Sequence, residues 1–402
     1  MSSPAQRRVR ELVDEIADEL VAFRRDVHAH PELARAEVRT TALVAERLRA
    51  EGLEPRLLAG TGLTCDVGTT GPGDTRPRVG LRADLDALPV PEETGLPYAS
   101  VVPGVSHACG HDVHTAAVLG AGIALARLHR EHPLPHPVRL VLQPAEEVQP
   151  GGALDLLQQG VTERLARIYA VHCEPKLDVG LVGTRIGPIT SASDEITIRV
   201  EGPGGHTSRP HLTGDVVAAL AQLATQLPAV LGRRLDPRAG VNLTWGTIRA
   251  GDAHNAIPTR GLLQGTLRSL DARAAEAAGP VLADAVEHVV APLGVTAELT
   301  HVRGVPPVVN DEGCTRALDR AVRGAVGPHA AVLTEQSLGG EDFAWYLTRV
   351  PGALARLGTR TPGSRPGDLH QAGFAPDERA VALGARLLAT VVLDEEPGAD
   401  EA

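Results

Sequence analysis

Short runs of valine and leucine in the first half of this chain are followed at once by side chains that can bind metal. Two such runs are residues 79–83 and 138–142, and a third begins near Arg167. The polar residues that follow or close them are Asp84, Asp86, Glu146, Glu147 and His172. Because the carboxyl ends of parallel strands open on one crevice, the pattern predicts a parallel sheet with these side chains gathered at one edge.

Helical patterns lie between and around these strands. Apolar residues recur at helical spacing from Val9 to Phe23, which predicts one helix over 5–27. Further helices are expected over about 37–51, 112–130, 152–160, 311–326 and 376–393. This alternation predicts an α/β fold in which a mostly parallel, mixed sheet is flanked by helices.

The pattern changes near residue 190, which indicates an inserted domain. Strands are expected over 195–200, 240–249, 260–270 and 295–303, and helices over 213–231 and 272–292. This β-α-β-β-α-β order is that of a ferredoxin-like α+β unit. We therefore expect a domain over 190–304 inserted into a first domain made of 1–189 and 305–393. Residues 394–402 are expected to form a disordered acidic tail.

The composition argues against some classes of binding partner. The 39 basic and 50 acidic residues give a net charge of −11, and no stripe of lysine and arginine appears, which argues against a nucleic-acid partner. The cysteines stand at 65, 109, 173 and 314 without paired spacing, and the chain begins with a charged, not an apolar, segment. No run approaches the ~18 apolar residues of a membrane helix. These features predict a cytoplasmic, thiol-reduced protein without a membrane partner.

The segment from His107 to His114 is the strongest metal signature. Cys109 and His111 flank Gly110, which permits an unusual backbone turn that can aim both side chains at metal. Alone, Cys109 would be interpreted as a small buried hydrophobe, but His111 and Asp112 beside it favour a ligand. Thiolate, imidazole and carboxylate together suit zinc, with manganese or cobalt as alternatives. Neighbouring His114 is expected to have a structural or orienting role.

Glu146 and Glu147 supply adjacent carboxylates. They could be a solvated helix N-terminus, where the helix dipole favours acids, but that would not explain their position directly after an apolar strand. If one carboxylate binds metal, its neighbour cannot easily reach the same ion. The neighbour can, however, accept a proton from a water molecule that the metal activates for attack on a substrate. We assign Glu147 as a metal ligand and Glu146 as the general base.

The inserted domain carries candidate substrate contacts. The turn from Gly202 to His211 is rich in glycine but lacks the Gly-Lys-Ser/Thr ending of a phosphate loop. His206 within it is better suited to donate to a developing oxyanion. Asn255 and Arg268 are polar groups amid strand-like sequence. Arg268 could bind a substrate carboxylate with two hydrogen bonds, and a surface salt bridge is an equally weighted alternative.

Several of these motifs occur together in one fixed order. They are Arg82–Pro89, His107–Asp112, Gln143–Glu147, His172–Pro175, Gly204–His206, Asn255–Pro258, Gly340–Phe343 and Leu369–His370. With the segment Arg24–Glu32 before them, they span nearly the whole chain. The chain resembles the dinuclear metallohydrolases that include aminoacylase and the glutamate-releasing carboxypeptidases. Within these it looks most like hippurate hydrolases and indole-acetyl-amino-acid amidohydrolases.

The resemblance implies a site. Two divalent ions, zinc or manganese with cobalt or nickel as alternatives, would be held by Cys109, His111, Glu147, His172 and His370, with Cys109 bridging. Glu146 would act as general base and then as general acid, with Asp86 as an orienting group. By the same resemblance, 1–189 and 305–393 would form the catalytic domain and 190–304 a lid. The residues expected to meet the substrate from the lid are His206, Asn255 and Arg268. Because the lid of this family commonly forms a dimer interface, the resemblance also implies a homodimer or a higher oligomer.

The function expected from this site is hydrolysis of the amide bond of a small N-acyl amino acid, with closure of the lid excluding water. A dipeptidase or carboxypeptidase shares the metal chemistry and is the main alternative. A non-catalytic metal-binding protein is the alternative from another class. That class predicts a lost base or ligand, whereas both glutamates and all five ligand residues are present.

Overall fold

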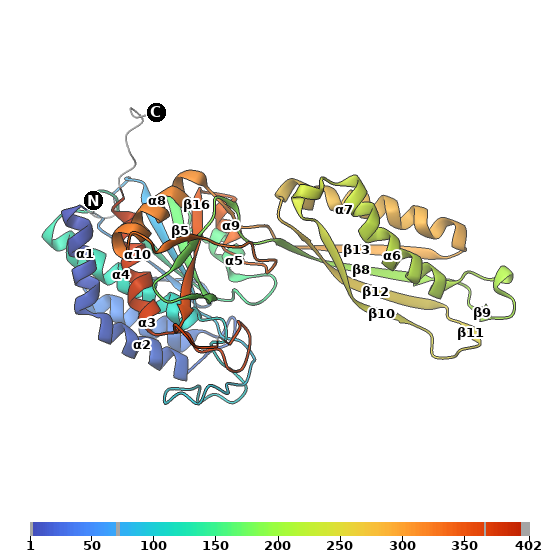
Figure 1. Cartoon of the computed structure of the whole chain (residues 1–402), viewed down its shortest axis with the longest axis horizontal. Coiled ribbons are helices and arrows are strands. Elements are labelled where there is room, and N and C mark those ends of the chain that lie inside the picture. Colours follow the sequence, from blue (N-terminus) through green and yellow to red (C-terminus); the bar gives the residue numbers. More distant parts are fainter. Residues whose placement is uncertain (1–2, 70–72, 366, 395–402) are drawn as a thin grey trace, which may run out of the picture. The chain divides into compact units, whose positions relative to one another are not determined.

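The chain folds into two units. The structure, a computed structural model, describes residues 3–69, 73–365 and 367–394. The first unit comprises Met1–Gly187, Val309–Glu335 and Trp345–Ala402, and the second comprises Pro188–Val308 and Gln336–Ala344 (Figure 1). The second unit thus takes in a segment, 336–344, that we expected in the catalytic domain.

An eight-stranded mixed sheet forms the centre of the first unit. Its order is β1 (Arg56–Leu57), β2 (Leu63–Val67), β4 (Val138–Gln143), β3 (Arg78–Asp84), β5 (Leu165–Asp178), β16 (Gly352–Arg360), β6 (Val182–Thr184) and β15 (Ala331–Leu333). The four central strands, β4, β3, β5 and β16, run parallel, and β15 runs parallel to β6, while the other neighbours are antiparallel. The expected mixed, mostly parallel sheet is confirmed.

Two strands depart from the sequence expectation. β5 runs to Asp178, so His172 lies within a strand and does not close it. β16 was not expected, although it is a buried central strand. Four of its nine residues are glycine or alanine, which have low strand propensity. It pairs in parallel with β5 and antiparallel with β6 and is buried along almost its whole length, which the local pattern does not reveal.

Helices flank this sheet. They are α1 (Pro4–Glu15), α2 (Ala17–Ala29), α3 (Val38–Ala50), α4 (His111–Glu131), α5 (Gly152–Gln158), α8 (Glu312–Ala325) and α10 (Arg379–Val392), with the short α9 (Ala344–Leu347) at a unit boundary. The single helix expected over 5–27 is wrong. The chain breaks at Ile16, whose ψ of 6° is not helical, and both α1 and α2 then pack against α4.

The expected disordered tail also needs correction at its start. Asp394 is described, is 9% exposed, and its carboxylate lies 2.5 Å from the guanidinium of Arg320 on α8. The remaining residues of the expected tail, 395–402, lie outside the described residues.

The second unit is a four-stranded antiparallel sheet with two helices. Its main elements are β8 (Ala192–Glu201), α6 (Val216–Arg234), β10 (Asn242–Ala250), β12 (Arg260–Ser269), α7 (Ala272–Val290) and β13 (Thr296–Val305). The strand order is β10-β12-β8-β13, which confirms the ferredoxin-like arrangement. Buried apolar side chains of α6 and α7 pack with those of the strands, among them Ile198, Leu223, Leu263 and Leu282. Shorter strands are β7 (Gly187–Pro188), β9 (Gly205–His206), β11 (Ala256–Ile257) and β14 (Val309–Asn310).

Helix α6 is unusually apolar for a surface helix. In the described part of the chain it is the one helix that could cross a membrane by length and composition, with a mean hydropathy of 1.3. Its residues Val216, Leu220, Leu223 and Leu227 are buried in the core of the second unit. The apolar side chains of α6 therefore already have a packing role in this fold.

We expect the buried ion pair between α2 and α4 to be a main source of stability in the first unit. Nε of Arg24 lies 2.5 Å from Oδ2 of Asp112, and both side chains are 0% exposed. Arg24→Met should lower stability by about 3–5 kcal/mol because the carboxylate of Asp112 would stay buried without its main counter-ion. Urea unfolding measures this loss. The control is Arg25→Met, since the half-exposed Arg25 pairs with Glu378 at the surface. Equal losses in both variants would contradict the expectation.

Candidate metal centre

The turn that carries the twin glutamates follows β4 directly. Its backbone is fixed by the carboxylate of Asp86, which lies just after β3 on the neighbouring parallel strand. The N–H of Glu146 donates to Oδ1 of Asp86 at 3.0 Å, and the N–H of Glu147 donates to Oδ2 at 2.9 Å. The two carboxylate oxygens of one residue therefore position two successive backbone units. These bonds use the backbone of the two glutamates and not their side chains.

The Cys-Gly-His step lies at the start of α4. Gly110 has a φ of +86°, and a Cβ on it would lie 2.6 Å from Sγ of Cys173, so the turn requires glycine. Nδ1 of His111 donates to the backbone carbonyl of Asp86 at 2.8 Å. Its Nε2 is buried, has no hydrogen-bond partner among the described residues, and lies 3.8 Å from Oε1 of Glu147. A buried nitrogen without a partner is suited to bind a metal ion.

His172 and His370 reach the same place from different elements. His172 donates from Nδ1 to the carbonyl of Cys173 at 2.7 Å, which leaves Nε2 at 3.6 Å from Sγ of Cys109. His370 lies in the loop between β16 and α10 with a φ of +62°. Its backbone N–H donates to Ala108, and its Nε2 lies 3.2 Å from Oε1 of Glu147.

These side chains form two overlapping groups. In each group, one donor atom per residue lies within 4.8 Å of the others. One group contains Cys109, Glu147 and His370, and the other contains His111, Glu146 and Glu147. Glu147 is common to both groups, and His172 joins the first through Cys109. The structure thus brings together all five residues that the sequence nominated as ligands, and the donor set fits two divalent ions.

The electrostatics favour a cation here. Burial, with the charge of Glu147, raises the pKa of the Cys109 thiol well above its usual range, so a thiolate at this position needs a positive partner. Burial and the nearby Arg356 guanidinium lower the pKa of His172, which keeps its ring neutral. A neutral imidazole is the form that binds metal. Burial alone would raise the pKa of Asp86, but hydrogen bonds from His111 and from the two glutamate N–H groups lower it overall.

Asp84 and His114 have partners of their own behind the site. Oδ1 of Asp84 accepts from Nδ1 of His114 at 2.6 Å, and Oδ2 accepts from Arg82 at 2.6 Å. Nε2 of His114 in turn accepts the backbone N–H of Cys173 at 2.8 Å. These buried bonds connect α4 to β3 and β5. They hold the start of α4, and with it His111, against the sheet.

The three lid residues do not gather at one point of the second unit. His206 lies in β9 and pairs in register with Ala256, the neighbour of Asn255, and Nδ1 of His206 accepts from the hydroxyl of Ser208 at 2.8 Å. Arg268 lies near the other end of β12 and donates to the carbonyl of Leu338. Arg260, at the end of β12 that follows β11, is eight residues from Arg268, or roughly 26 Å along a strand.

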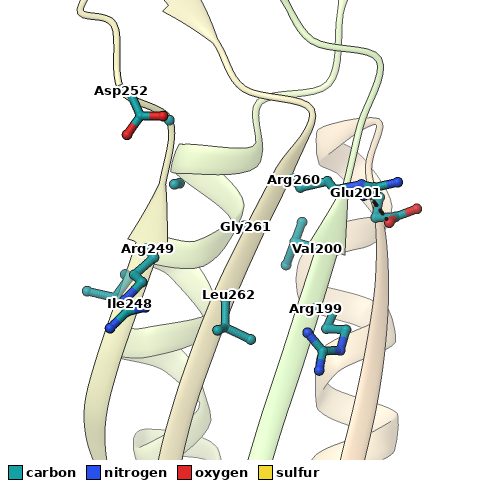
Figure 2. Close-up of a pocket in the computed structure, with 11 residues that line it drawn as sticks. Arg199, Val200, Glu201, Ile248, Arg249, Asp252, Arg260, Gly261 and Leu262 are labelled. Carbon is teal, nitrogen blue, oxygen red and sulfur yellow. Dashed lines mark ion pairs between the residues drawn. The ribbon is translucent and has the colours of Figure 1, made fainter.

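The second unit also has a hollow of its own. About 720 Å³ of space lies over the ends of β8, β10 and β12 (Figure 2). Arg260 and Glu201 form an ion pair across 3.3 Å beside it, and the exposed Arg199 and Arg249 also line it. None of the proposed ligands or substrate contacts lies among its lining residues. The hollow is therefore separate from the residues expected to bind metal and substrate.

The α/β sheet and the gathered thiol, imidazole and carboxylate groups define a metal-dependent hydrolase. Residues 80–394 match peptidase family M20/M25/M40, and the chain belongs to this family. A solved structure from Bacillus subtilis, described as a dinuclear metal-binding peptidase of the M20 family, superposes with a TM-score of 0.81 at 31% identity. The superposition covers 94% of this chain and 98% of the chain from Bacillus subtilis. The expectation of a dinuclear metal-dependent hydrolase is confirmed at the level of the family.

Two curated relatives extend the comparison. N-acetyl-L-cysteine deacetylase of Bacillus subtilis is 35% identical over 364 residues, which cover 90% of this chain and 85% of that protein. A Rhodococcus jostii protein, whose name proposes a glutamate–cysteine ligase, is 51% identical over 381 residues. That match covers 94% of this chain but 47% of the relative, so the chain spans about half the length of that protein.

We expect removal of the Cys109 thiol to lower metal content. Cys109→Ala deletes the soft donor of the group that Cys109 forms with Glu147 and His370, and no neighbouring sulfur replaces it, since Cys173 faces Gly110. The purified variant should retain fewer metal equivalents than the wild type by mass spectrometry. Chelation should also lower its unfolding temperature less than that of the wild type, because bound metal stabilises the folded state. The control is Cys65→Ala, a buried cysteine of β2 outside the site. Unchanged metal content in Cys109→Ala would contradict the assignment.

Proposed function

We propose that this protein hydrolyses the amide bond of N-acyl amino acids to a carboxylic acid and a free amino acid. The substrate class comprises hippurate-like, acetylated or aryl-acylated amino acids. The carrying observation is that Glu147 belongs to both groups of metal-type donors, while its neighbour Glu146 belongs to one of them. Further support comes from the relative named for deacetylation of N-acetyl-L-cysteine and from the motifs shared with hippurate hydrolases.

The proposed ligands are Cys109, His111, Glu147, His172 and His370, and zinc or manganese suits this mixed set. When bound, the ions lower the pKa of water and polarise the scissile carbonyl. Asp86 holds the backbone of both glutamates through its two oxygens. Glu146 accepts the proton of the attacking water and then delivers it to the leaving nitrogen.

The proposed substrate contacts are His206 for the oxyanion, with Asn255 beside it, and Arg268 for the substrate carboxylate. Because Arg268 is separated from the other two by much of the length of β12, one copy of the second unit does not present all three to one small substrate. The proposed homodimer or higher oligomer would supply them from two copies. This makes assembly part of the proposed function.

Replacement of Glu146 tests the division of labour between the glutamates. Glu146→Gln removes the proton acceptor but no proposed ligand, so it should keep wild-type metal content and lose about 10²–10⁴-fold in kcat on an N-acyl amino acid. Metal analysis and steady-state rates measure the two effects. The matched variant Glu147→Gln should lose metal as well as activity. If Glu146→Gln turned over substrate at the wild-type rate, Glu146 would not be the base.

A substrate panel tests the reaction itself. The metal-reconstituted protein would be given hippurate, N-acetyl amino acids and simple dipeptides, with Glu146→Gln as the background control. The proposal predicts the highest kcat/KM on an N-acyl amino acid. Faster turnover of dipeptides would favour the dipeptidase or carboxypeptidase alternative. Bound metal without hydrolysis of any compound would favour a metal-binding protein.

A further inference from the structure

We infer that Glu37 is a positioning residue for the twin-glutamate turn, although it lies 108 residues before that turn in the chain. Its carboxylate holds the backbone of Ala145, the residue directly before the proposed base Glu146 and two before the proposed ligand Glu147. The part of this inference that concerns catalysis rests on the proposed function. The part that concerns metal binding depends only on the ligand role of Glu147.

The contacts of Glu37 converge on this turn. Its side chain is fully buried, and Oε1 accepts the N–H of Ala145 at 2.8 Å. The same oxygen accepts the N–H of Arg35 at 3.0 Å, while Oε2 accepts the hydroxyl of Thr61 at 2.6 Å. Bonds from three separate segments of chain therefore fix the carboxylate. A carboxylate fixed in this way can define the position of the amide that it binds.

The turn needs such a partner because its backbone is strained. Ala145 has a φ of +56°, in the left-handed region that is unfavourable for a residue with a side chain. Its carbonyl accepts the N–H of Gly152 at 2.8 Å, so the residue is held on both sides. With Asp86, Glu37 completes a run of three successive N–H groups bound by carboxylates: those of Ala145, Glu146 and Glu147.

A role confined to helix α3 does not account for Glu37. It precedes the first residue of α3, yet its side chain makes no capping bond to that helix. Glu32 does so instead, since its two oxygens accept the N–H groups of Arg39 and Thr40 at 2.9 and 2.8 Å. Burial of a carboxylate is costly, and burial raises the pKa of Glu37. The hydrogen bond from the N–H of Ala145 helps to offset the cost of burying this carboxylate.

Glu32 therefore provides a matched control for the test. Glu37→Ala removes the carboxylate that binds the turn, whereas Glu32→Ala removes a carboxylate that binds only the start of α3. Glu37→Gln is the conservative variant, because its amide oxygen can still accept from Ala145 while its amide nitrogen can donate to Thr61. Three quantities are measured: zinc affinity, backbone amide exchange over residues 144–148 in chelated protein, and kcat and KM on an N-acyl amino acid.

The expected pattern separates positioning from general stability. Glu37→Ala should weaken zinc binding about 10–100-fold, speed exchange over 144–148, and lower kcat more than it changes KM. Glu37→Gln should restore most of each quantity. Glu32→Ala should lower the unfolding temperature but leave zinc affinity and the exchange of 144–148 at wild-type values.

Two results would overturn the inference: unchanged zinc affinity and exchange in Glu37→Ala, or equal losses in Glu32→Ala. Should Glu37→Ala fail to fold, Thr61→Val, which removes the second contact of the carboxylate, must show smaller changes of the same sign. Wild-type zinc affinity in Thr61→Val would then reject the inference. If the zinc and exchange results hold while the wild type cleaves no N-acyl amino acid, the positioning role stands and the proposed function fails.

Discussion

The candidate metal centre depends most on the hydrogen bonds that Asp86 accepts. The carboxylate of Asp86 accepts from the N–H groups of Glu146 and Glu147, and its backbone carbonyl group accepts from Nδ1 of His111. This single residue, two positions after the end of β3, thereby connects the turn after β4 to the start of α4. Because β3 and β4 run parallel, the two turns lie side by side at their carboxyl ends, and a single short side chain can join them. Parallel pairing thus determines which residues can form the site.

Much of this arrangement follows from the sequence because local rules and the fold agree there. Apolar runs over 79–83 and 138–142 predicted β3 and β4, and the site at their ends followed from parallel pairing. The failures arise where long-range packing outweighs local pattern. The break at Ile16 divides a continuous helical periodicity, because two shorter helices can both lie against α4. β16, rich in alanine and glycine, becomes a strand through its two neighbours in the sheet.

The proposed ligands show the same division. Cys109 and His111 belong to one short motif and the two glutamates are adjacent in another, so the spacing within each motif indicates a metal site. His370 has no such signal: it is a half-exposed loop histidine, brought to Glu147 by a left-handed backbone and a bond to Ala108. It was found only through resemblance to a family. Glu37 was missed for a related reason, since nothing local to α3 indicates that its carboxylate binds an amide 108 residues away.

The second unit sets a limit on how the substrate can be bound. Strand β12 holds Arg268 eight residues from Arg260, and His206 and Asn255 lie in or beside the separate two-stranded sheet of β9 and β11, which precedes the Arg260 end of β12. A hinge that moves the whole unit cannot shorten that distance. A small N-acyl amino acid, only a fraction of that length, can contact one end of the unit but not both. If all three residues touch one substrate, they must come from two copies of the chain. Oligomeric assembly would then be required for catalysis.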